Sequence, residues 1–459
     1  MTETAALHPA GTERTYAAEE LFFSTTDAAG RIRRANSTFM RLAGYPRGAL
    51  VGKPHNVVRH EVMPAGVFRL VWNAIQDGKA ASAYITNKAS DGNYYRVFAT
   101  IVPSGDGYLS VRTLPMLTEL RDKVEAAYAR VLEVEQASAQ AGSPAREVAA
   151  AGEAALLAEL KELGYADAVE FTRQTLTAEV AALVASGVDI PERPDAEGAV
   201  ATVLAQMNAI ESATGGLVGL LDECARLVTL LGRRAEEIGA LSTRLSQLRE
   251  DLRLAADDVD RLGAGQEADE VRERYQEVDA LVLECFEQLR PLAGQVEELG
   301  RDTDSVRFAI ALLRLHNLAA GFFALQLLDG EDALDANDAV GSLHELTQAL
   351  HEGAASLAQR LSLYRARAEL VGGELDVVAR ALTDTHRPLI DLLGAASDAG
   401  AANETSVRQA RSLVRDGFPE ARDLADLADA VRDLEVPDLT ETIDSCPAKV
   451  RTALAELSA

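Results

Sequence analysis

The chain has 459 residues and a net charge of −27, and this length is sufficient for two or three domains with buried cores. The charge is uneven, because residues 1–116 carry a net charge of +4 and the remainder carries −31. A surface that acidic repels phosphate backbones and anionic lipid headgroups. We therefore expect protein partners with basic faces, and neither nucleic acid nor a membrane surface.

The cysteines and the N-terminus indicate the compartment. Cys224, Cys285 and Cys446 lie far apart without histidines at metal-ligand spacing, which predicts neither a disulfide framework nor a zinc site. No run approaches about 20 uninterrupted apolar residues, and the first twenty residues lack the basic and apolar regions of a signal peptide. We expect a cytoplasmic protein with no membrane span and with residues 1–16 disordered.

The aromatic residues mark the first compact unit. Twelve of the 22 Phe, Tyr and Trp residues precede residue 117, including Trp72, the only tryptophan. Alternation and turn residues predict strands and short helices here. The strands are predicted at 21–26, 31–35, 83–88, 94–103 and 108–113, and the helices at 36–43 and 63–76. We expect an α+β domain over residues 17–116, in which short helices accompany a five-stranded antiparallel sheet that ends in a meander.

After residue 116 the sequence pattern becomes helical. Ala, Leu, Glu and Arg dominate, and apolar residues recur at heptad spacing over 217–259, 271–327 and 343–389, which is typical of coiled coils. We expect an all-α region with a helical connector at 117–200, a long coiled-coil hairpin at 201–400 and C-terminal helices at 401–459.

Glycine and proline punctuate the predicted hairpin. The polar run Asp329-Gly330-Glu331-Asp332 interrupts the heptads, and so short a break predicts an antiparallel turn with its tip near 328–338. Pro291 and Pro388 fall inside the apolar seams, where each predicts a kink or a helix end.

One string in the first domain is specific. Gly52-Lys53-Pro54-His55-Asn56-Val57-Val58-Arg59-His60, followed by Met63-Pro64, lies between the two predicted helices. Together with TDAAGRIRRANSTFM, VFRLVWNAIQDGK and GYLSVRT, it resembles the PAS domain of aerotaxis receptors. The resemblance implies a PAS fold that holds a flavin, FAD, whose redox state reports respiration or oxygen. The positions that it associates with flavin binding are Asn36, Arg59, His60, Trp72 and Asn87. Where these receptors read Pro-Asp after the histidine, this chain has Glu61 and Val62.

The same residue types suit a flavin on chemical grounds. A dinucleotide needs cations for its pyrophosphate and an apolar or aromatic wall for its ring. Arg59 supplies a cation, and Trp72 with Tyr84, Tyr94 and Tyr95 supplies aromatic surface. The alternative is that these aromatic residues only fill the core of the domain.

The histidines of the string leave other interpretations open. His55 and His60 are equally compatible with capping or hydrogen-bonding roles. Haem ligation by either one is less favoured, because a single histidine gives no spacing signature.

The helical region resembles the receptors less closely. In aerotaxis receptors the PAS domain is followed by membrane spans and by a helical hairpin whose tip contacts a kinase and a coupling protein. This sequence predicts a hairpin without spans, and it lacks the Glu-Ala-Ala-Arg and Gly-Arg-Gly-Phe strings of that tip. We interpret residues 201–400 as a degenerate chemoreceptor-like region.

No enzyme motif stands out in the chain. A Walker loop, a dinucleotide fingerprint after a strand, a serine nucleophile elbow and a His-Glu-x-x-His string are all missing. We predict a non-enzymatic redox or oxygen sensor in signal transduction, related to aerotaxis and chemotaxis. A homodimer would pass the cofactor state through its coiled coil to a signalling protein, such as a chemotaxis coupling protein or kinase. The alternative function is a cofactor-free PAS scaffold that serves for dimerisation.

Overall fold

The computed structural model describes residues 9–46, 48–262, 265–330, 336–402, 404–415 and 417–433, with short pieces from 445 onward. Within these ranges the side chains of 213–222, 224–225, 262 and 336–337 are not described. The chain divides into two compact units. The first comprises Met1–Leu221, Arg307–Ala358 and Pro437–Ala459, and the second comprises Asp222–Val306 and Gln359–Val436.

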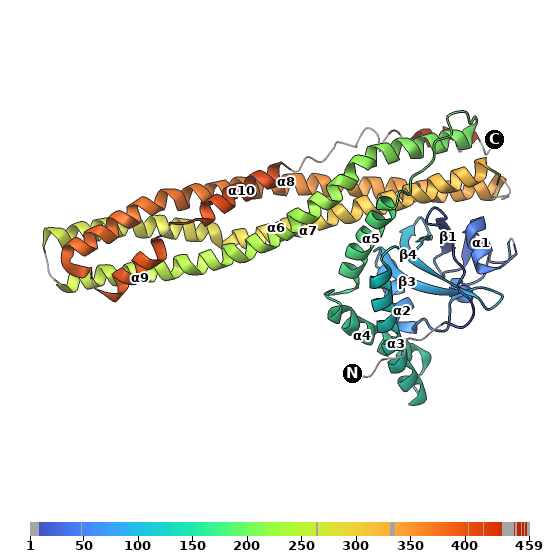
Figure 1. Cartoon of the computed structure of the whole chain (residues 1–459), viewed down its shortest axis with the longest axis horizontal. Coiled ribbons are helices and arrows are strands. Elements are labelled where there is room, and N and C mark those ends of the chain that lie inside the picture. Colours follow the sequence, from blue (N-terminus) through green and yellow to red (C-terminus); the bar gives the residue numbers. More distant parts are fainter. Residues whose placement is uncertain are drawn as a thin grey trace. The chain divides into compact units, whose positions relative to one another are not determined.

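A five-stranded antiparallel sheet lies in the first unit (Figure 1). Its strands are β1 (Phe22–Asp27), β2 (Ile32–Ala35), β3 (Ala81–Lys88), β4 (Tyr94–Ser104) and β5 (Gly107–Thr113). The strand order is β2-β1-β5-β4-β3, so the last three strands form the predicted meander and β5 closes it against β1. The predicted α+β class, followed by a long helical region, is confirmed.

Short helices cover the inner face of the sheet. They are α1 (Ser37–Ala43), the 3-10 helix η1 (His55–Val58) and α2 (Ala65–Gln76). Helix α1 begins where the Asn36 Oδ1 accepts a 3.3 Å hydrogen bond from Phe39 N, and it ends at Gly44 with φ 70°. Between α1 and the sheet lies a core that includes Phe22, Phe39 and Tyr95.

The outer face of the sheet is also buried. Phe23, Tyr84 and Val111 point away from the inner core, yet each is at most 2 % exposed. Helix α5 (Ala168–Ala185) packs on β3, where the Thr172 hydroxyl accepts a 3.1 Å hydrogen bond from Ser82 N. The ring of Phe323 packs edge-on against Phe23, with ring centroids 5.0 Å apart. Segments later in the same chain therefore cover this face.

Two further helices complete the connector. Helix α3 (Thr118–Gln140) follows β5, and α4 (Ala145–Glu162) packs against both α2 and α3. The predicted connector at 117–200 is thus three helices that lie beside the sheet (Figure 1).

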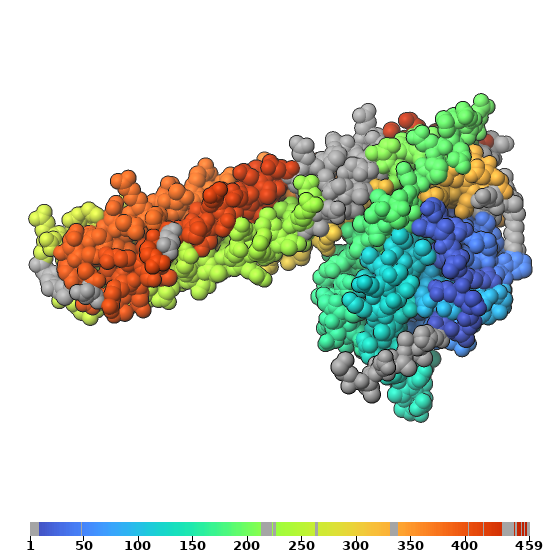
Figure 2. Space-filling model, viewed as in Figure 1, coloured from blue at the N-terminus to red at the C-terminus, as the bar shows by residue number. Residues whose placement is uncertain are grey.

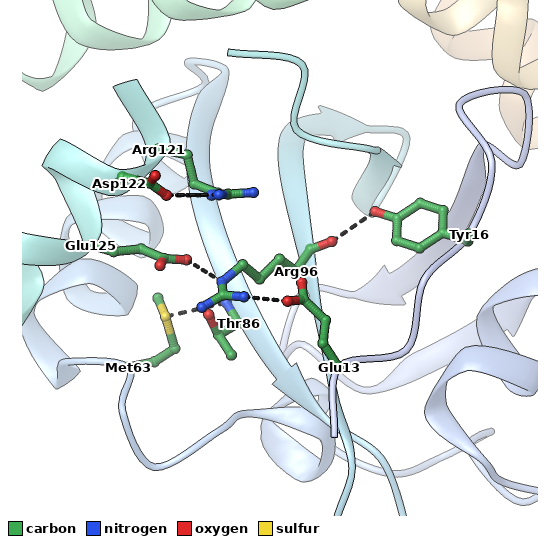
Figure 3. Close-up of polar contacts among 8 residues, drawn as sticks. All are labelled: Glu13, Tyr16, Met63, Thr86, Arg96, Arg121, Asp122 and Glu125. Atoms are coloured by element: carbon green, nitrogen blue, oxygen red, sulfur yellow. Dashed lines mark hydrogen bonds and ion pairs between the residues drawn. The ribbon is translucent and has the colours of Figure 1, made fainter. Parts of the chain in front are cut away.

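The segment before β1 lies along the domain, whereas we expected residues 1–16 to be disordered. Residues 1–8 are outside the described part, but Glu13 bridges to Tyr94 and the Arg14 N donates a 2.7 Å hydrogen bond to Tyr94 O. The Arg96 guanidinium on β4 pairs with Glu13 and with Glu125 of α3, and the Tyr16 hydroxyl donates to Arg96 O (Figure 3). In Figure 2 this dark-blue segment lies against the cyan strands. Its ion pairs and backbone hydrogen bonds explain the order, which composition did not predict.

Three long helices make up most of the rest: α6 (Ala199–Leu262), α7 (Gln266–Leu328) and α8 (Ala336–Ala396). In the second unit, Arg249 of α6 pairs with Asp279 of α7 at 2.7 Å, and the Cys285 Sγ lies 3.5 Å from the Thr385 Oγ1 of α8. Consecutive helices thus pack within one chain. Both Pro291 and Pro388 lie inside continuous helices, so neither ends one.

The second unit also contains the last described helices, α9 (Thr405–Val414) and α10 (Glu420–Arg432), which follow the short π-helix η2 (Ser397–Ala401). Arg244 of α6 pairs with Glu420 at 2.7 Å, and Arg432 donates a 3.0 Å hydrogen bond to Gly372 O of α8. The C-terminal helices therefore pack back onto α6 and α8.

Helix α7 contains a long apolar stretch in its first-unit part. An 18-residue window of this helix is long and apolar enough to cross a membrane, but 94 % of it is buried within the protein. From Phe308 to Leu325 only Leu312 is not fully buried. Packing inside the unit accounts for this hydropathy.

The turn between α7 and α8 lies in the first unit. Residues 329–330 form a turn and 331–335, part of the predicted tip, fall outside the described residues. On either side of the turn, Phe323 contacts Phe23, and Arg34 of β2 pairs with Glu345 of α8. The two flanks of this turn therefore contact the sheet of the first unit.

Candidate functional site

A cavity of about 430 Å³ lies between the inner face of the sheet and helix α2. Its volume is within the range of small-molecule sites, and its wall is mainly apolar with a few polar groups. Its lining residues come from the β1–β2 turn, η1, α2 and strands β1, β3, β4 and β5. They are Thr26, Ala29, Gly30, Pro54, His55, Asn56, Arg59, Phe68, Val71, Trp72, Ile75, Ile85, Asn87, Ala99, Ile101, Tyr108, Ser110 and Arg112.

Helix α2 supplies one apolar wall. Phe68, Val71, Trp72 and Ile75 are spaced by three and four residues, so they fall on one face of the helix. The sole tryptophan packs edge-on against Tyr108 of β5, with centroids 5.4 Å apart.

The sheet supplies the opposite wall by alternation. Tyr108, Ser110 and Arg112 are every second residue of β5, as Ile85 and Asn87 are of β3. The central position of β5, between β1 and β4, brings its polar residues to the cavity floor.

Gly30 in the β1–β2 turn allows the tryptophan to lie where it does. Its φ of 76° favours glycine, and a Cβ at this position would lie 2.7 Å from the Trp72 Cζ2. A larger residue at position 30 would clash with the indole.

Arg59 lies at the cavity with a half-buried side chain. An isolated backbone bridge joins it to Asn87, its Nη2 donates a 2.6 Å hydrogen bond to Met63 O, and its guanidinium lies 4.5 Å from the Phe68 ring centre. Burial lowers the pKa of Arg59. The structure therefore brings Arg59, Trp72 and Asn87 together around one space.

A second arginine, Arg112, is 2 % exposed at the floor of the cavity. Its Nη2 donates to the Ser24 Oγ at 3.0 Å and lies 2.5 Å from the His55 Nε2. Burial, and then the Arg112 charge, lower the pKa of His55 to about 3. His55 is therefore neutral at neutral pH, and its Nε2 accepts the hydrogen bond from Arg112.

Two of the predicted residues lie away from the cavity. The Asn36 side chain caps α1, and its Nδ2 donates a 3.4 Å hydrogen bond to the Gln326 Oε1 of α7. The His60 Nδ1 accepts from Val62 N at 3.2 Å, and its ring packs against Tyr94. Both side chains are buried and form hydrogen bonds away from the cavity, although they lie in the same sequence strings as the cavity residues.

The aromatic wall differs from the one that we expected. Tyr84 lies on the outer face, where its hydroxyl bonds Glu179, and neither Tyr94 nor Tyr95 lines the cavity. The lining tyrosine is Tyr108. Alternate residues of a strand point to opposite faces of the sheet. Which tyrosines face the cavity can therefore be predicted only after one residue of each strand has been assigned to a face.

Helix α2 is anchored at several points. The buried Glu135 carboxylate of α3 accepts hydrogen bonds from Ala65 N at 2.9 Å and Gly66 N at 2.7 Å, at the N-terminus of α2. Glu153 of α4 pairs with Arg69 at 2.7 Å. The cavity wall is thus tied directly to the connector helices.

Metal binding finds no support in the part of the chain that the structure describes. No group of three or more His, Cys, Asp and Glu side chains there is placed to hold an ion. The cavity itself combines a mainly apolar wall with a few polar groups.

The sheet with its inner helices and cavity defines a PAS-type sensory domain. The PAS fold family matches residues 20–111. Over 113 residues the chain is 36 % identical to the aerotaxis receptor of Escherichia coli (strain K12), in a match that covers 23 % of this chain and 22 % of that receptor. The chain thus matches less than a quarter of the receptor's length. The predicted aerotaxis-receptor-like PAS domain is confirmed, and it supports a sensor in signal transduction.

Proposed function

We propose that this protein is a non-enzymatic redox or oxygen sensor whose PAS cavity holds a flavin, FAD. The observation that carries the proposal is the cavity itself, in a domain similar to that of an aerotaxis receptor. When bound, a flavin supplies a ring whose oxidation state follows the supply of electrons. The domain's own residues would bind that ring and pass on its state.

The residues of the cavity fit such a group. Phe68, Trp72 and Ile101 offer apolar surface for a planar ring. Arg59 is partly exposed, and it suits the pyrophosphate because guanidinium groups bind phosphate oxygens in pairs. The buried Ser110 Oγ has no hydrogen-bond partner among the residues that the structure describes, which fits a group that meets a ligand.

Haem is a weaker candidate for the same cavity. The His55 Nε2 is engaged by Arg112 at 2.5 Å, and the His60 ring is directed to Tyr94, away from the lining. The His55 Nε2 is thus occupied by a protein donor, and His60 does not line the cavity, so neither is placed as an axial ligand would be.

The anchors of α2 suggest the route of the signal. A change at Trp72 or Phe68 would act on α2, whose N-terminus is held by Glu135 of α3 and whose middle is held by Glu153 of α4. The connector helices lead to α6. We propose that the long helices then present the signal to a signalling protein, such as a chemotaxis coupling protein or kinase, in the cytoplasm and in a homodimer.

The second candidate is a cofactor-free PAS scaffold for dimerisation. The outer face of the sheet, a surface available for pairing in an isolated domain, is covered by α5 and by Phe323 of α7. The cavity has no role in this alternative. Both observations favour the ligand-binding proposal.

Purification of the full-length protein tests the proposal. We expect a yellow protein with flavin absorbance, and heat release followed by mass spectrometry should identify FAD. A protein that stays colourless after aerobic and anaerobic preparation, and that does not bind added FAD, would favour the scaffold. The Arg59→Ala variant should carry less flavin, whereas Lys88→Ala, which removes an exposed cation next to Asn87, should carry the wild-type amount.

A further inference from the structure

Arg112 is a deeply buried cation without an acidic partner among the described residues. Its hydrogen-bond partners are the Ser110 carbonyl at 3.4 Å, the Ser24 hydroxyl at 3.0 Å and the His55 imidazole at 2.5 Å. The carbonyl and the hydroxyl are uncharged, and the imidazole is neutral at neutral pH because the pKa of His55 is lowered to about 3. Burial lowers the pKa of Arg112 to about 10, so the guanidinium remains charged at neutral pH.

Another buried arginine of the same unit shows the contrast. Arg314 of α7 is 7 % exposed and pairs with the Glu211 carboxylate of α6, which also accepts a 2.9 Å hydrogen bond from the Asn317 amide. Buried charges are normally compensated in this way. Among the described residues Arg112 has no carboxylate partner, and besides its three neutral hydrogen-bond partners it has the faces of Phe39 and Phe22, with ring centres 4.8 and 5.7 Å from its guanidinium carbon.

The position of Arg112 indicates which kind of ligand could interact with its charge. The side chain lines the cavity floor together with Ser110, whose buried Oγ has no hydrogen-bond partner among the described residues. The facing wall, formed by Phe68, Val71, Trp72 and Ile75, is apolar. In the part of the chain that the structure describes, a cation without a carboxylate partner thus lies beside a hydroxyl without a hydrogen-bond partner, and together they suit an electron-rich ligand edge.

We infer that Arg112 is a ligand-recognition residue that holds the carbonyl-bearing or anionic edge of a planar ring at the cavity floor. The inference rests on the proposed flavin function and adds that the two arginines bind different parts of the flavin. Arg112, fully buried, contacts the ring, whose pyrimidine edge carries two carbonyl oxygens. Arg59, partly exposed, contacts the phosphates. The cavity therefore selects rings with an acceptor edge over neutral apolar or cationic rings.

Binding by the full-length protein separates the two arginines. Riboflavin has the ring but no phosphate, so Arg112→Met should weaken riboflavin and FAD by the same factor, tenfold or more, whereas Arg59→Ala should weaken FAD alone. Removal of a positive charge beside the ring should also lower the reduction potential of bound flavin. A tenfold change in the redox equilibrium corresponds to about 30 mV for a two-electron couple. Arg112→Lys should restore most of both effects. Unchanged affinity and potential in Arg112→Met, or a loss restricted to FAD, would overturn the inference.

Thermal unfolding of the ligand-free protein provides a second test, which does not depend on flavin. Arg112→Met removes three hydrogen bonds to neutral acceptors, but it also removes a buried charge that has no acidic partner among the described residues. If Arg112 is kept for a ligand, these two effects offset each other, and the melting temperature should stay close to that of the wild type. The control Arg314→Met leaves Glu211 buried without its cation and should melt lower. An Arg112→Met protein that melts as low as Arg314→Met would make Arg112 a structural residue and refute the inference. Failure of the wild type to bind flavin would refute the proposed function. The melting temperatures of Arg112→Met and Arg314→Met would still decide the role of Arg112.

Discussion

The phenol of Tyr84 on β3 donates a 2.7 Å hydrogen bond to the buried carboxylate of Glu179 on α5. The same carboxylate accepts hydrogen bonds from Met116 N at 2.7 Å and Leu117 N at 3.1 Å, where β5 leads into α3. One side chain therefore ties the outer face of the sheet, the start of α3 and α5 together. Burial raises the pKa of Glu179, and its three donors act against that effect.

Replacement of Glu179 tests this connection. Glu179→Ala leaves three donors without their acceptor, and an unsatisfied buried group costs about 1–3 kcal/mol. We expect the free energy of unfolding to fall by roughly 2–4 kcal/mol in urea titrations, with a smaller loss in Glu179→Gln, which keeps one acceptor. Glu119→Ala, at an exposed site in the first turn of α3, is the control and should cost at most about 1 kcal/mol. Equal losses in both alanine variants would argue against a central role for Glu179.

The close crossing of α2 and α4 depends on glycine. A Cβ on Gly66 would lie 2.3 Å from the backbone N of Glu153 and from the Gly152 carbonyl carbon, so Gly66→Ala must push the helices apart. We expect a loss of about 1–3 kcal/mol in unfolding free energy, as for other overpacked sites. In Gly294→Ala, at a helical glycine of α7, the added Cβ would meet no described atom within 4 Å beyond the adjoining residues and backbone of its own helix. The same change should there stabilise the protein by up to about 1 kcal/mol. A neutral Gly66→Ala would show that the two helices have room to move.

Local patterns predicted the sheet, because alternation and glycine turns set strand positions residue by residue. The motif strings also brought Arg59, Trp72 and Asn87 to one cavity. The strings did not show that Asn36 and His60 lie away from the cavity, because a sequence string does not indicate the direction in which each side chain points.

The remaining features depend on contacts between distant parts of the chain. Arg112 lies in the string GYLSVRT, but its role follows from the central place of β5 and from the approach of His55. The contact of Phe23 with Phe323 joins residues about three hundred positions apart. Periodicity predicts that a helix has an apolar face, but it does not name the partner of that face.

The affinity for flavin should depend on Arg59 more than on Trp72. Arg59→Ala removes a charged donor, an interaction worth about 1.5–3 kcal/mol, so FAD should bind roughly ten- to a hundredfold more weakly. Trp72→Phe keeps an aromatic face and should cost less. Quenching of flavin fluorescence on binding measures both affinities. Wild-type affinity in Arg59→Ala would show that the phosphates lie elsewhere.

The stability of the protein should fall on mild acidification. The pKa of His55 is about 3 in the folded protein, against 6.5 in a free side chain, so between these values the unfolded chain binds a proton that the folded protein does not. The free energy of unfolding therefore rises with pH between about 3 and 6.5, and the stability that neutral His55 contributes is lost as the pH falls below about 6.5. His55→Asn should flatten the slope. His316, whose pKa is lowered to about 4 by burial, contributes in the same direction, so the double variant should be flatter still. An unaltered slope in the double variant would contradict this assignment.

The pairing of α7 and α8 within one chain can be tested with a single new cysteine. The buried Cys285 Sγ lies 3.5 Å from the Thr385 Oγ1, so Thr385→Cys would place two thiols in contact. The test requires Cys224→Ser and Cys446→Ser in the background, which leaves Cys285 as the only other thiol. We expect mild oxidation to give an intramolecular disulfide, seen as a faster-migrating monomer on a non-reducing gel. Thr383→Cys, two residues earlier and therefore on another face of α8, is the control and should crosslink far more slowly. Crosslinked dimers from Thr385→Cys, without the faster monomer, would mean that the two helices pair between chains, and the single-chain packing of the second unit would then be wrong.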